Sequence, residues 1–237
     1  MSDGDLAQRV QRGDRRALAR LISAIESGDP ASEKTVAALV EEVAPAPRIG
    51  ITGPPGAGKS TLVGAVIAEL RSRGDTVAVL AVDPSSPVTG GALLGDRIRM
   101  QDHVEDPGVY IRSMASRGHL GGLSPAAGPT IAVLARSGFD IVLVETVGVG
   151  QSEVEVMDHV DQVVLVVSPG WGDQIQADKA GIVEITDVFV VNKGDRPGVE
   201  VVQRALLERM GGGSEAPVLV TAAIKGEGVP ALVDVIR

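Results

Sequence analysis

The stretch that decides the fold reads Ile49-Gly50-Ile51-Thr52-Gly53-Pro54-Pro55-Gly56-Ala57-Gly58-Lys59-Ser60-Thr61. From Gly53 onward it fits the phosphate-binding P-loop, G-x-x-x-x-G-K-[ST], at every required position. That loop needs a strand before it and a helix after it. The sequence supplies an apolar run over Ile49–Thr52 and a helical stretch over Ser60–Arg73. It therefore predicts a nucleotide-binding loop between a strand and a helix.

The residue types of this loop suit a bound phosphate chain. Glycines let backbone N–H groups converge on the β-phosphate, and the start of the following helix adds positive potential. We expect Lys59 to bridge β- and γ-phosphate oxygens and Ser60 to give its hydroxyl oxygen to Mg²⁺. The alternative is a glycine-rich turn that binds nothing, which the flanking strand and helix disfavour.

Further short apolar runs follow the P-loop, rich in β-branched residues and with little polar alternation. They are Val77–Val82, Val109–Ile111, Ile141–Val144, Val163–Val167, Val188–Val191 and Val218–Val220. Such runs are typical of strands buried on both faces of a parallel sheet. Crossover helices fit between most of them, over Pro125–Arg136, Gln174–Ile185 and Val199–Met210. The expected fold is an α/β P-loop NTPase with a mostly parallel central sheet flanked by helices.

The chain before this pattern has apolar residues at helical spacing, which predict two or three short amphipathic helices. Asp14 and Ser32 stand where helix N-caps are useful, and Gly28-Asp29-Pro30 interrupts the helical pattern. A stiff Pro45-Ala46-Pro47 joint then leads into the first strand.

These patterns divide the chain into two parts. We expect residues 1–44 to form an N-terminal helical appendage and residues 45–237 to form the P-loop domain. We expect the appendage to pack against the main domain. An arm that binds a partner is the alternative.

A second motif, Asn192-Lys193-Gly194-Asp195, directly follows the run Val188–Val191 and matches the base-reading N-K-x-D pattern of GTP-binding proteins. Guanine presents N1–H and an N2 amino group side by side, and one carboxylate accepts both bonds. Adenine has no such donor pair, so a buried Asp195 would lose its partners and ATP should bind poorly. An ordinary loop is the alternative for a tetrapeptide this short. After a P-loop, the motif predicts GTP and GDP as ligands.

Three carboxylates follow apolar runs or head a helix: Asp83, Asp96 and Glu145. A Mg²⁺ ion that bridges phosphates keeps several waters, and carboxylates hold those waters in octahedral geometry. We expect these three residues to surround the metal together with Ser60. The alternatives are an N-cap role for Asp96 and an Asp-Pro turn at Asp83.

The segment Glu145-Thr146-Val147-Gly148 is a modified form of the D-x-x-G switch, whose glycine N–H meets the γ-phosphate. Ras-type enzymes place a water-orienting glutamine directly after that glycine. Here the position is Val149, which cannot orient water. The sequence therefore predicts slow intrinsic hydrolysis, unless Asp96 or a bound partner supplies the missing group.

Composition excludes several function classes. The chain has 31 acidic and 22 basic residues, a net charge of −9, which disfavours nucleic acid and anionic membranes as partners. It has no cysteine, which rules out disulfides, zinc ribbons and a thiolate nucleophile, and its three histidines are far apart. The polar N-terminus and the lack of a long apolar run predict a cytoplasmic protein.

Several longer segments together resemble the MeaB/ArgK family of P-loop GTPases. They are GITGPPGAGKSTL, VDPSSP, GDRIRM, SMASRGHLGGLS, FDIVLVETVGVGQSE, VNKGD and AAIKGEG, and they cover nearly the whole chain. The resemblance implies a chaperone for adenosylcobalamin-dependent methylmalonyl-CoA mutase, in which GTP binding and hydrolysis gate cofactor loading and protect the mutase. It also implies a homodimer, built by a C-terminal helical arm that usually follows the last strand in this family.

The same resemblance assigns roles by motif. It implies that the phosphates and the metal are bound by Lys59, Ser60, Asp83, Asp96 and Glu145. It implies further contacts to the nucleotide from Gly148, Asn192, Lys193, Asp195, Ala222 and Ala223. A relay of nucleotide state to the mutase, which also helps to activate hydrolysis, falls to Trp171, Gln176 and Lys179.

Two other activities are the alternatives. One is a P-loop phosphotransferase, an ArgK-like kinase or transport ATPase, which would not need the N-K-x-D motif. The other is a nickel-insertion GTPase of the hydrogenase or urease type, and the lack of cysteine and of a histidine cluster weighs against it.

Overall fold

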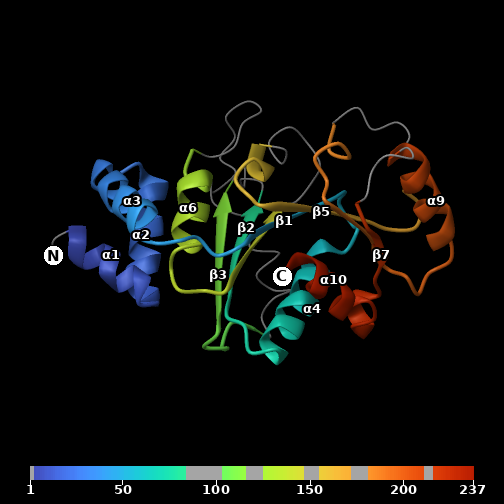
Figure 1. The fold of residues 1–237 in the computed structure, drawn as a ribbon, viewed down its shortest axis with the longest axis horizontal. Coiled ribbons are helices and arrows are strands. Elements are labelled where there is room, and N and C mark those ends of the chain that lie inside the picture. Colours follow the sequence, from blue (N-terminus) through green and yellow to red (C-terminus); the bar gives the residue numbers. More distant parts are fainter. Residues whose placement is uncertain (1–2, 84–102, 116–124, 147–154, 172–180, 211–215) are drawn as a thin grey trace, which may run out of the picture.

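A seven-stranded parallel sheet crosses the middle of the molecule (Figure 1). The computed structural model describes residues 3–83, 103–115, 125–146, 155–171, 181–210 and 216–237. The strands are β1 Arg48–Thr52, β2 Val77–Asp83, β3 Val109–Ala115, β4 Ile141–Thr146, β5 Gln162–Val167, β6 Val188–Val191 and β7 Val218–Val220, in the order β3-β2-β4-β1-β5-β6-β7. All six neighbouring pairs are parallel. The predicted α/β fold and all seven predicted strands are confirmed.

The sheet is covered by helices on both faces. Helices α4 (Lys59–Ser72) and α10 (Val229–Ile236) share one apolar cluster with alternate residues of β1, β2 and β4. Helix α6 (Ala127–Leu134) packs on the opposite face, and α9 (Val199–Met210) packs on β5 and β6. In β2, Val79 belongs to the apolar cluster with α4 and α10, and Leu80 belongs to the apolar cluster with α6 on the other face. Successive strand residues point to opposite faces, so an unbroken apolar run fits a strand covered on both sides.

One predicted crossover helix, Gln174–Ile185, is wrong over its described part. Residues 182–185 form a turn, and residues 174–180 lie outside the described ranges. Gly181 has a φ of +69°, a left-handed conformation that breaks a helix. The Thr186 hydroxyl then donates a 2.6 Å bond to the carbonyl of Ile182, which closes the turn before β6 begins.

The N-terminal segment forms three helices, α1 Asp3–Gln11, α2 Arg15–Ser27 and α3 Pro30–Glu42. The predicted Asp14 cap is confirmed, because its carboxylate accepts bonds from the N–H groups of Arg16 and Ala17. The predicted Ser32 cap is wrong: Asp29 is the N-cap of α3, and Ser32 donates a 2.6 Å bond to the Asp29 carbonyl. Proline suits the first helical position, so the helix begins at Pro30.

These three helices pack on the α6 side of the sheet (Figure 1). The buried side chains Leu18, Leu21 and Ile22 of α2 lie in the same apolar cluster as α6, β2 and β4. Arg112 of β3 forms an ion pair with Glu26 of α2. β3 continues past the apolar run that predicted it, because residues 112–115 keep pairing with β2, and the polar Arg112 faces α2 rather than open water.

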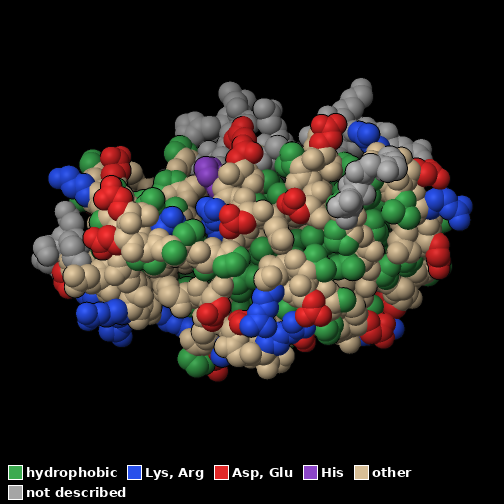
Figure 2. Space-filling model, viewed as in Figure 1, with side chains coloured by type: hydrophobic (Ala, Val, Ile, Leu, Met, Phe, Trp, Pro, Cys, Tyr) green, Lys and Arg blue, Asp and Glu red, His purple; other side chains and the backbone are tan. Residues whose placement is uncertain are grey.

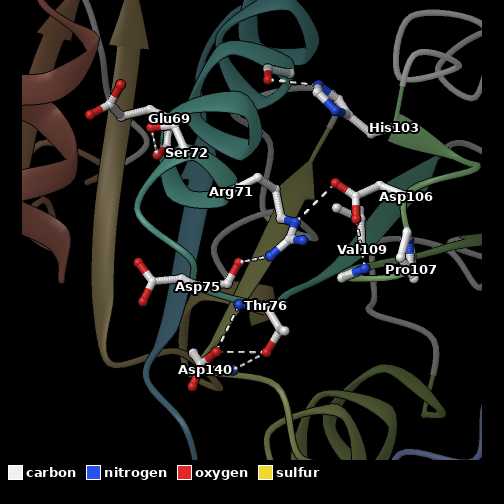
Figure 3. Close-up of polar contacts among 12 residues, drawn as sticks. Glu69, Arg71, Ser72, Asp75, Thr76, His103, Asp106, Pro107, Val109 and Asp140 are labelled. Carbon is white, nitrogen blue, oxygen red and sulfur yellow. Dashed lines mark hydrogen bonds and ion pairs between the residues drawn. The ribbon is translucent and has the colours of Figure 1, made fainter.

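A polar cluster holds the amino ends of three neighbouring strands together (Figure 3). Arg71 Nε lies 2.9 Å from Asp106 Oδ2, and Arg71 Nη1 donates a 2.6 Å bond to the carbonyl of Asp75. Asp140, just before β4, accepts 2.7 Å bonds from the backbone N–H and the hydroxyl of Thr76, just before β2. These bonds hold the pKa of Asp140 below its ordinary value. The cluster fixes the sheet at the edge opposite the P-loop.

None of the helices in the described ranges is both long and apolar enough to cross a bilayer. Figure 2 shows acidic and basic side chains interspersed over the visible face, with apolar side chains between them.

Candidate functional site

The P-loop connects β1 to α4 at the carboxyl edge of the sheet, where parallel α/β folds bind their ligands. Gly53 has a φ of +147°, and a Cβ there would lie 2.0 Å from the carbonyl oxygen of Val166 in β5. Gly58, the N-cap of α4, has a φ of +92°, and its Cβ would lie 2.6 Å from Asn192 Nδ2. Both positions favour glycine because of their positive φ, and at Gly53 the backbone of the neighbouring strand β5 also leaves no room for a side chain.

Lys59 is folded into the loop that it follows. Its ammonium donates bonds of 2.8 Å to the carbonyl of Gly53 and 3.1 Å to the carbonyl of Pro54, and the residue is 6% exposed. The positive charge is thus held inside the curve of the loop. A phosphate chain in this curve gains a fixed cation and converging backbone N–H groups.

Ser60 and Glu145 meet beside the loop. The Ser60 hydroxyl donates a 2.7 Å bond to Glu145 Oε1, and both residues are buried. Strand β4 pairs with β1 so that Glu145 is the register partner of Ile51, which places this carboxylate next to the start of the P-loop. The two predicted metal residues therefore lie together.

A hydroxyl pair links the same two strand ends. Thr146 Oγ1 donates a 3.0 Å bond to Thr52 Oγ1, and both residues are buried, at 1% and 0% exposed. Thr52 directly precedes the P-loop, and Thr146 directly follows Glu145. Sequence reasoning missed this pair, because only the strand register shows that the two threonines are neighbours.

Asn192 braces the P-loop from the end of β6. Its Nδ2 donates to the carbonyls of Ala57 and Gly58 at 3.1 and 3.3 Å. Its Oδ1 accepts from the Thr221 hydroxyl at 3.1 Å and from the Ala223 N–H at 3.2 Å. One buried amide therefore ties together the P-loop, β6 and the segment after β7.

Lys193 makes a second connection to the P-loop. Its ammonium donates a 2.5 Å bond to the carbonyl of Gly56. Among the described non-glycine residues it alone has a positive φ, +60°. Left-handed backbone at a non-glycine residue is concentrated in functional sites, where surrounding contacts hold it in place.

A pocket opens between the first turn of α4, the segment after β6 and the short 3₁₀ helix η2, Ala223–Lys225. Its lining residues are Gly58, Thr61, Asn192, Lys193, Asp195, Arg196, Ala222, Ala223 and Ile224. The structure thus brings the end of the P-loop, the N-K-x-D motif and the predicted Ala222 and Ala223 to one place. Asp195 is exposed there, although the expected discrimination against adenine required it to be buried, and Lys225 Nζ lies 3.6 Å from Asp195 Oδ2.

The structure therefore places the P-loop next to a pocket that contains one carboxylate. Comparison with known proteins adds an independent observation. The protein family described as Methylmalonyl Co-A mutase-associated GTPase MeaB matches residues 18–237 of the chain. The chain belongs to the MeaB family. The family predicted from the sequence motifs is confirmed, and so is its class of enzyme, a P-loop GTPase.

Individual relatives agree with membership of the MeaB family. A Pyrococcus horikoshii protein whose name includes the word GTPase is 47% identical over an alignment 243 residues long, which covers 98% of this chain and 76% of that protein. The protein named methylmalonic aciduria type A homolog, mitochondrial, of Caenorhabditis briggsae is 40% identical over an alignment 205 residues long, which covers 80% of this chain and 50% of that protein. A crystal structure of a LAO/AO transport system kinase has a TM-score of 0.74 at 29% identity, and the match covers 99% of this chain and 73% of that one.

The MeaB-family chain offers donors that fit Mg²⁺. Oxygen ligands suit this ion, and it usually binds through one or two protein groups together with substrate phosphates and water. Ser60 and Glu145 supply a hydroxyl and a carboxylate beside the P-loop. Asp83 closes β2, but its side chain and all of Asp96 lie outside the described residues. Within the described ranges no group of three or more His, Cys, Asp or Glu side chains is arranged to hold a metal ion.

Three other predicted residues of this MeaB-family site, Gly148, Gln176 and Lys179, also lie outside the described ranges. Trp171 is partly buried and packs against the apolar cluster of β5, β6 and α9. Sequence reasoning missed Arg196, Ile224 and Lys225 around the base pocket. The segment AAIKGEG after the last strand was the available signal for the last two.

Proposed function

We propose that this protein is a Mg²⁺-dependent GTPase that acts as a chaperone for adenosylcobalamin-dependent methylmalonyl-CoA mutase, gating cofactor loading and protecting the mutase. The position of Asp195 carries the nucleotide part of the proposal, because a carboxylate in a pocket that adjoins the P-loop suits the paired donors of guanine. The description of the MeaB family as mutase-associated, and the methylmalonic aciduria name of a relative, support the partner.

Different residues of the site would bind the base, the phosphates and the metal. Asp195 would accept the N1–H and N2 amino bonds of guanine, while Asn192 and Lys193 brace the P-loop through bonds to the carbonyls of Ala57 and Gly56. Lys59 exchanges its bonds to loop carbonyls for oxygens of the β- and γ-phosphates. Ser60 and Glu145 would hold the metal. When bound, Mg²⁺ neutralises charge that develops on the phosphate oxygens during hydrolysis.

Slow intrinsic hydrolysis and stimulation by the partner complete the proposal. Val149 stands where a Ras-type enzyme has its water-orienting glutamine, so this chain lacks that group at that position. Asp96 or the mutase would supply the missing function. Trp171, Gln176 and Lys179 belong to the segment that would carry the nucleotide state to the mutase.

Two measurements on the purified protein test the proposal. The first is the affinity for GTP, ATP and xanthosine triphosphate before and after Asp195→Asn. The amide donates where the carboxylate accepted, so GTP should bind at least tenfold more weakly and xanthosine triphosphate more tightly. The second is GTP turnover alone and with an adenosylcobalamin-dependent methylmalonyl-CoA mutase from the same cell. GTP affinity that is unchanged in Asp195→Asn would show that Asp195 does not bind the base. GTP turnover that is unchanged by the mutase would show that the mutase is not the partner that stimulates hydrolysis.

A phosphotransferase is the second candidate, because the similar crystal structure is titled a transport system kinase. A kinase of this kind would not require Asp195 for its nucleotide. Preference for ATP over GTP, together with transfer of the γ-phosphate to an acceptor instead of water, would favour it over the GTPase.

A further inference from the structure

The carboxyl ends of β1 and β4 are joined by a bond between two side chains. The register between these strands ends at the pair Ile51–Glu145. The next residue on each strand is a threonine, and Thr146 Oγ1 donates a 3.0 Å bond to Thr52 Oγ1. The hydroxyl pair therefore continues the contact between the strands by one position, at the point where Thr52 leads into the P-loop.

The backbone register connects each threonine to a different strand. Thr52 is the register partner of Leu165 in β5, and Thr146 is the register partner of Val82 in β2. The hydroxyl bond joins the two threonines directly to each other. It thus links the strand that carries the P-loop to the strand that carries Glu145.

The hydroxyl pair and Glu145 lie on opposite faces of the sheet, because successive strand residues point to opposite faces. Glu145 points toward α4, where its Oε1 accepts the bond from the Ser60 hydroxyl. Thr146 shares its face with Val144, which belongs to the apolar cluster of α6. The pair therefore acts on Glu145 through the backbone of β4.

The burial of the two hydroxyls shows that their bond matters. Thr52 and Thr146 are 0% and 1% exposed, and Ile141–Val144 of the same strand are all aliphatic. Valine would fill a threonine position with the same shape and without a polar group. A buried hydroxyl is unfavourable unless it has a partner. Two threonines here therefore favour the arrangement in which the two strand ends lie side by side.

We propose that Thr52 and Thr146 are a positioning pair, whose bond sets the separation between Glu145 and the P-loop and thereby the affinity of the site for Mg²⁺. The inference rests on the proposed metal role of Glu145 and goes beyond it by naming residues that act on the metal site through the backbone. Mg²⁺ requires near-ideal octahedral geometry. A carboxylate from β4 and phosphates held after β1 meet that requirement only when the two strand ends keep a fixed separation.

The test measures Mg²⁺ binding to the complex of the full chain with GDP by calorimetry. Thr146→Val should weaken Mg²⁺ binding about tenfold, while GDP affinity in the presence of a chelator changes by about twofold or less. Thr146→Ser keeps the hydroxyl and should recover most of the Mg²⁺ affinity. Thr52→Val should weaken Mg²⁺ binding as much as Thr146→Val, and the double variant should be no weaker than either, because the same bond is lost in all three.

Thr186→Val is the matched control. Thr186 is also buried, at 8% exposed, and its hydroxyl donates a 2.6 Å bond to the carbonyl of Ile182 in the turn before β6. This variant loses a buried hydroxyl bond as well, so it should unfold more easily and yet bind Mg²⁺ as the parent does. An equal loss of Mg²⁺ affinity in Thr186→Val and Thr146→Val would reduce the effect to general destabilisation and overturn the positioning role.

Mg²⁺ affinity that is unchanged in Thr146→Val would also overturn the positioning role. Glu145→Gln separates this inference from the proposed function on which it rests. If Glu145→Gln weakens Mg²⁺ binding to the GDP complex while Thr146→Val does not, the positioning pair alone fails. If neither variant weakens Mg²⁺ binding, Glu145 does not serve the metal, and the proposed metal site fails with it.

Discussion

The Ser60 hydroxyl donates a 2.7 Å hydrogen bond to Glu145 Oε1, and this contact joins the first turn of α4 to the carboxyl end of β4. The two residues are 85 positions apart in sequence, and both are buried, at 5% and 3% exposed. The side chains proposed to hold the metal are therefore brought together by the protein itself, and a bound nucleotide would find them already in place.

Glu145→Gln keeps the shape of this contact and removes its charge. We expect the Mg²⁺ concentration needed for half-maximal GTP hydrolysis to rise, and turnover to fall about 100-fold, because a neutral amide oxygen is a much weaker partner for the cation and its waters. GDP affinity in the presence of a chelator should change by about twofold or less. A Mg²⁺ titration of turnover measures the first effect and calorimetry the second.

Ser72→Ala is the control, since Ser72 lies in the same helix and its exposed hydroxyl donates only to the Glu69 carbonyl. An unchanged Mg²⁺ titration in Glu145→Gln would show that this carboxylate does not serve the metal.

Lys59→Ala tests the phosphate end of the site. Loss of the ammonium removes the fixed cation of the P-loop, so GTP and GDP should bind about 100-fold more weakly or worse, and turnover should disappear. Equilibrium binding of both nucleotides measures the effect. Lys34→Ala, at an exposed lysine of α3, provides the control for a lost positive charge. Turnover that survives Lys59→Ala would assign the phosphate contact to another residue.

The Thr52–Thr146 pair gives a prediction about stability. Thr146→Val replaces one hydroxyl by a methyl of the same shape and leaves the Thr52 hydroxyl buried without this donor, so it should cost about 1–2 kcal/mol of unfolding free energy. Removing both hydroxyls takes away the mismatch, and the double variant should be less destabilised than the sum of the single ones. Urea unfolding of the parent protein, the two single variants and the double variant measures how strongly the two hydroxyls are coupled. Strict additivity would show that the 3.0 Å contact contributes nothing.

The sequence was sufficient for the sheet because its strands are buried on both faces. Runs such as Val188–Val191 show little polar alternation and have clear ends, and they predicted the strands closely. The motifs that bind phosphate and base were also readable, since their chemistry requires particular residues at particular spacings. The strand order, with β5 between β1 and β6, then brings the P-loop and the N-K-x-D motif to the same edge of the sheet.

The features that the sequence did not show are of two kinds. Some depend on contacts between residues far apart in the chain, and others depend on which of two nearby residues takes the same structural role. Asp29 and Ser32 both suit an N-cap, and the proline between them decided in favour of Asp29. β3 extends to Ala115 along β2, and its Arg112 pairs with Glu26, which is distant in the chain. Ile224 looked like any apolar residue near a strand end, and only the folded chain shows it exposed at the edge of a pocket.

Asp140 provides a prediction about pH. Its carboxylate accepts bonds from the Thr76 N–H and hydroxyl, and these bonds lower its pKa in the folded state. The unfolded chain has the ordinary Asp pKa of about 3.9, so it takes up the proton first as pH falls. The carboxylate therefore stabilises the fold above about pH 4, and this contribution is lost as pH drops through the lower, folded pKa.

Asp140→Asn removes this titration while preserving the size of the side chain. The variant should be less stable than the parent at pH 7, by about 1 kcal/mol or less for this exposed group, and the difference should shrink steadily below about pH 4. Urea unfolding of both proteins between pH 3 and pH 7 measures it, with Asp158→Asn, at another exposed carboxylate, as the control for net charge. A stability difference that stayed constant across this range would mean that the bonds from Thr76 do not favour the ionised carboxylate, because only a group whose pKa changes on folding makes stability depend on pH.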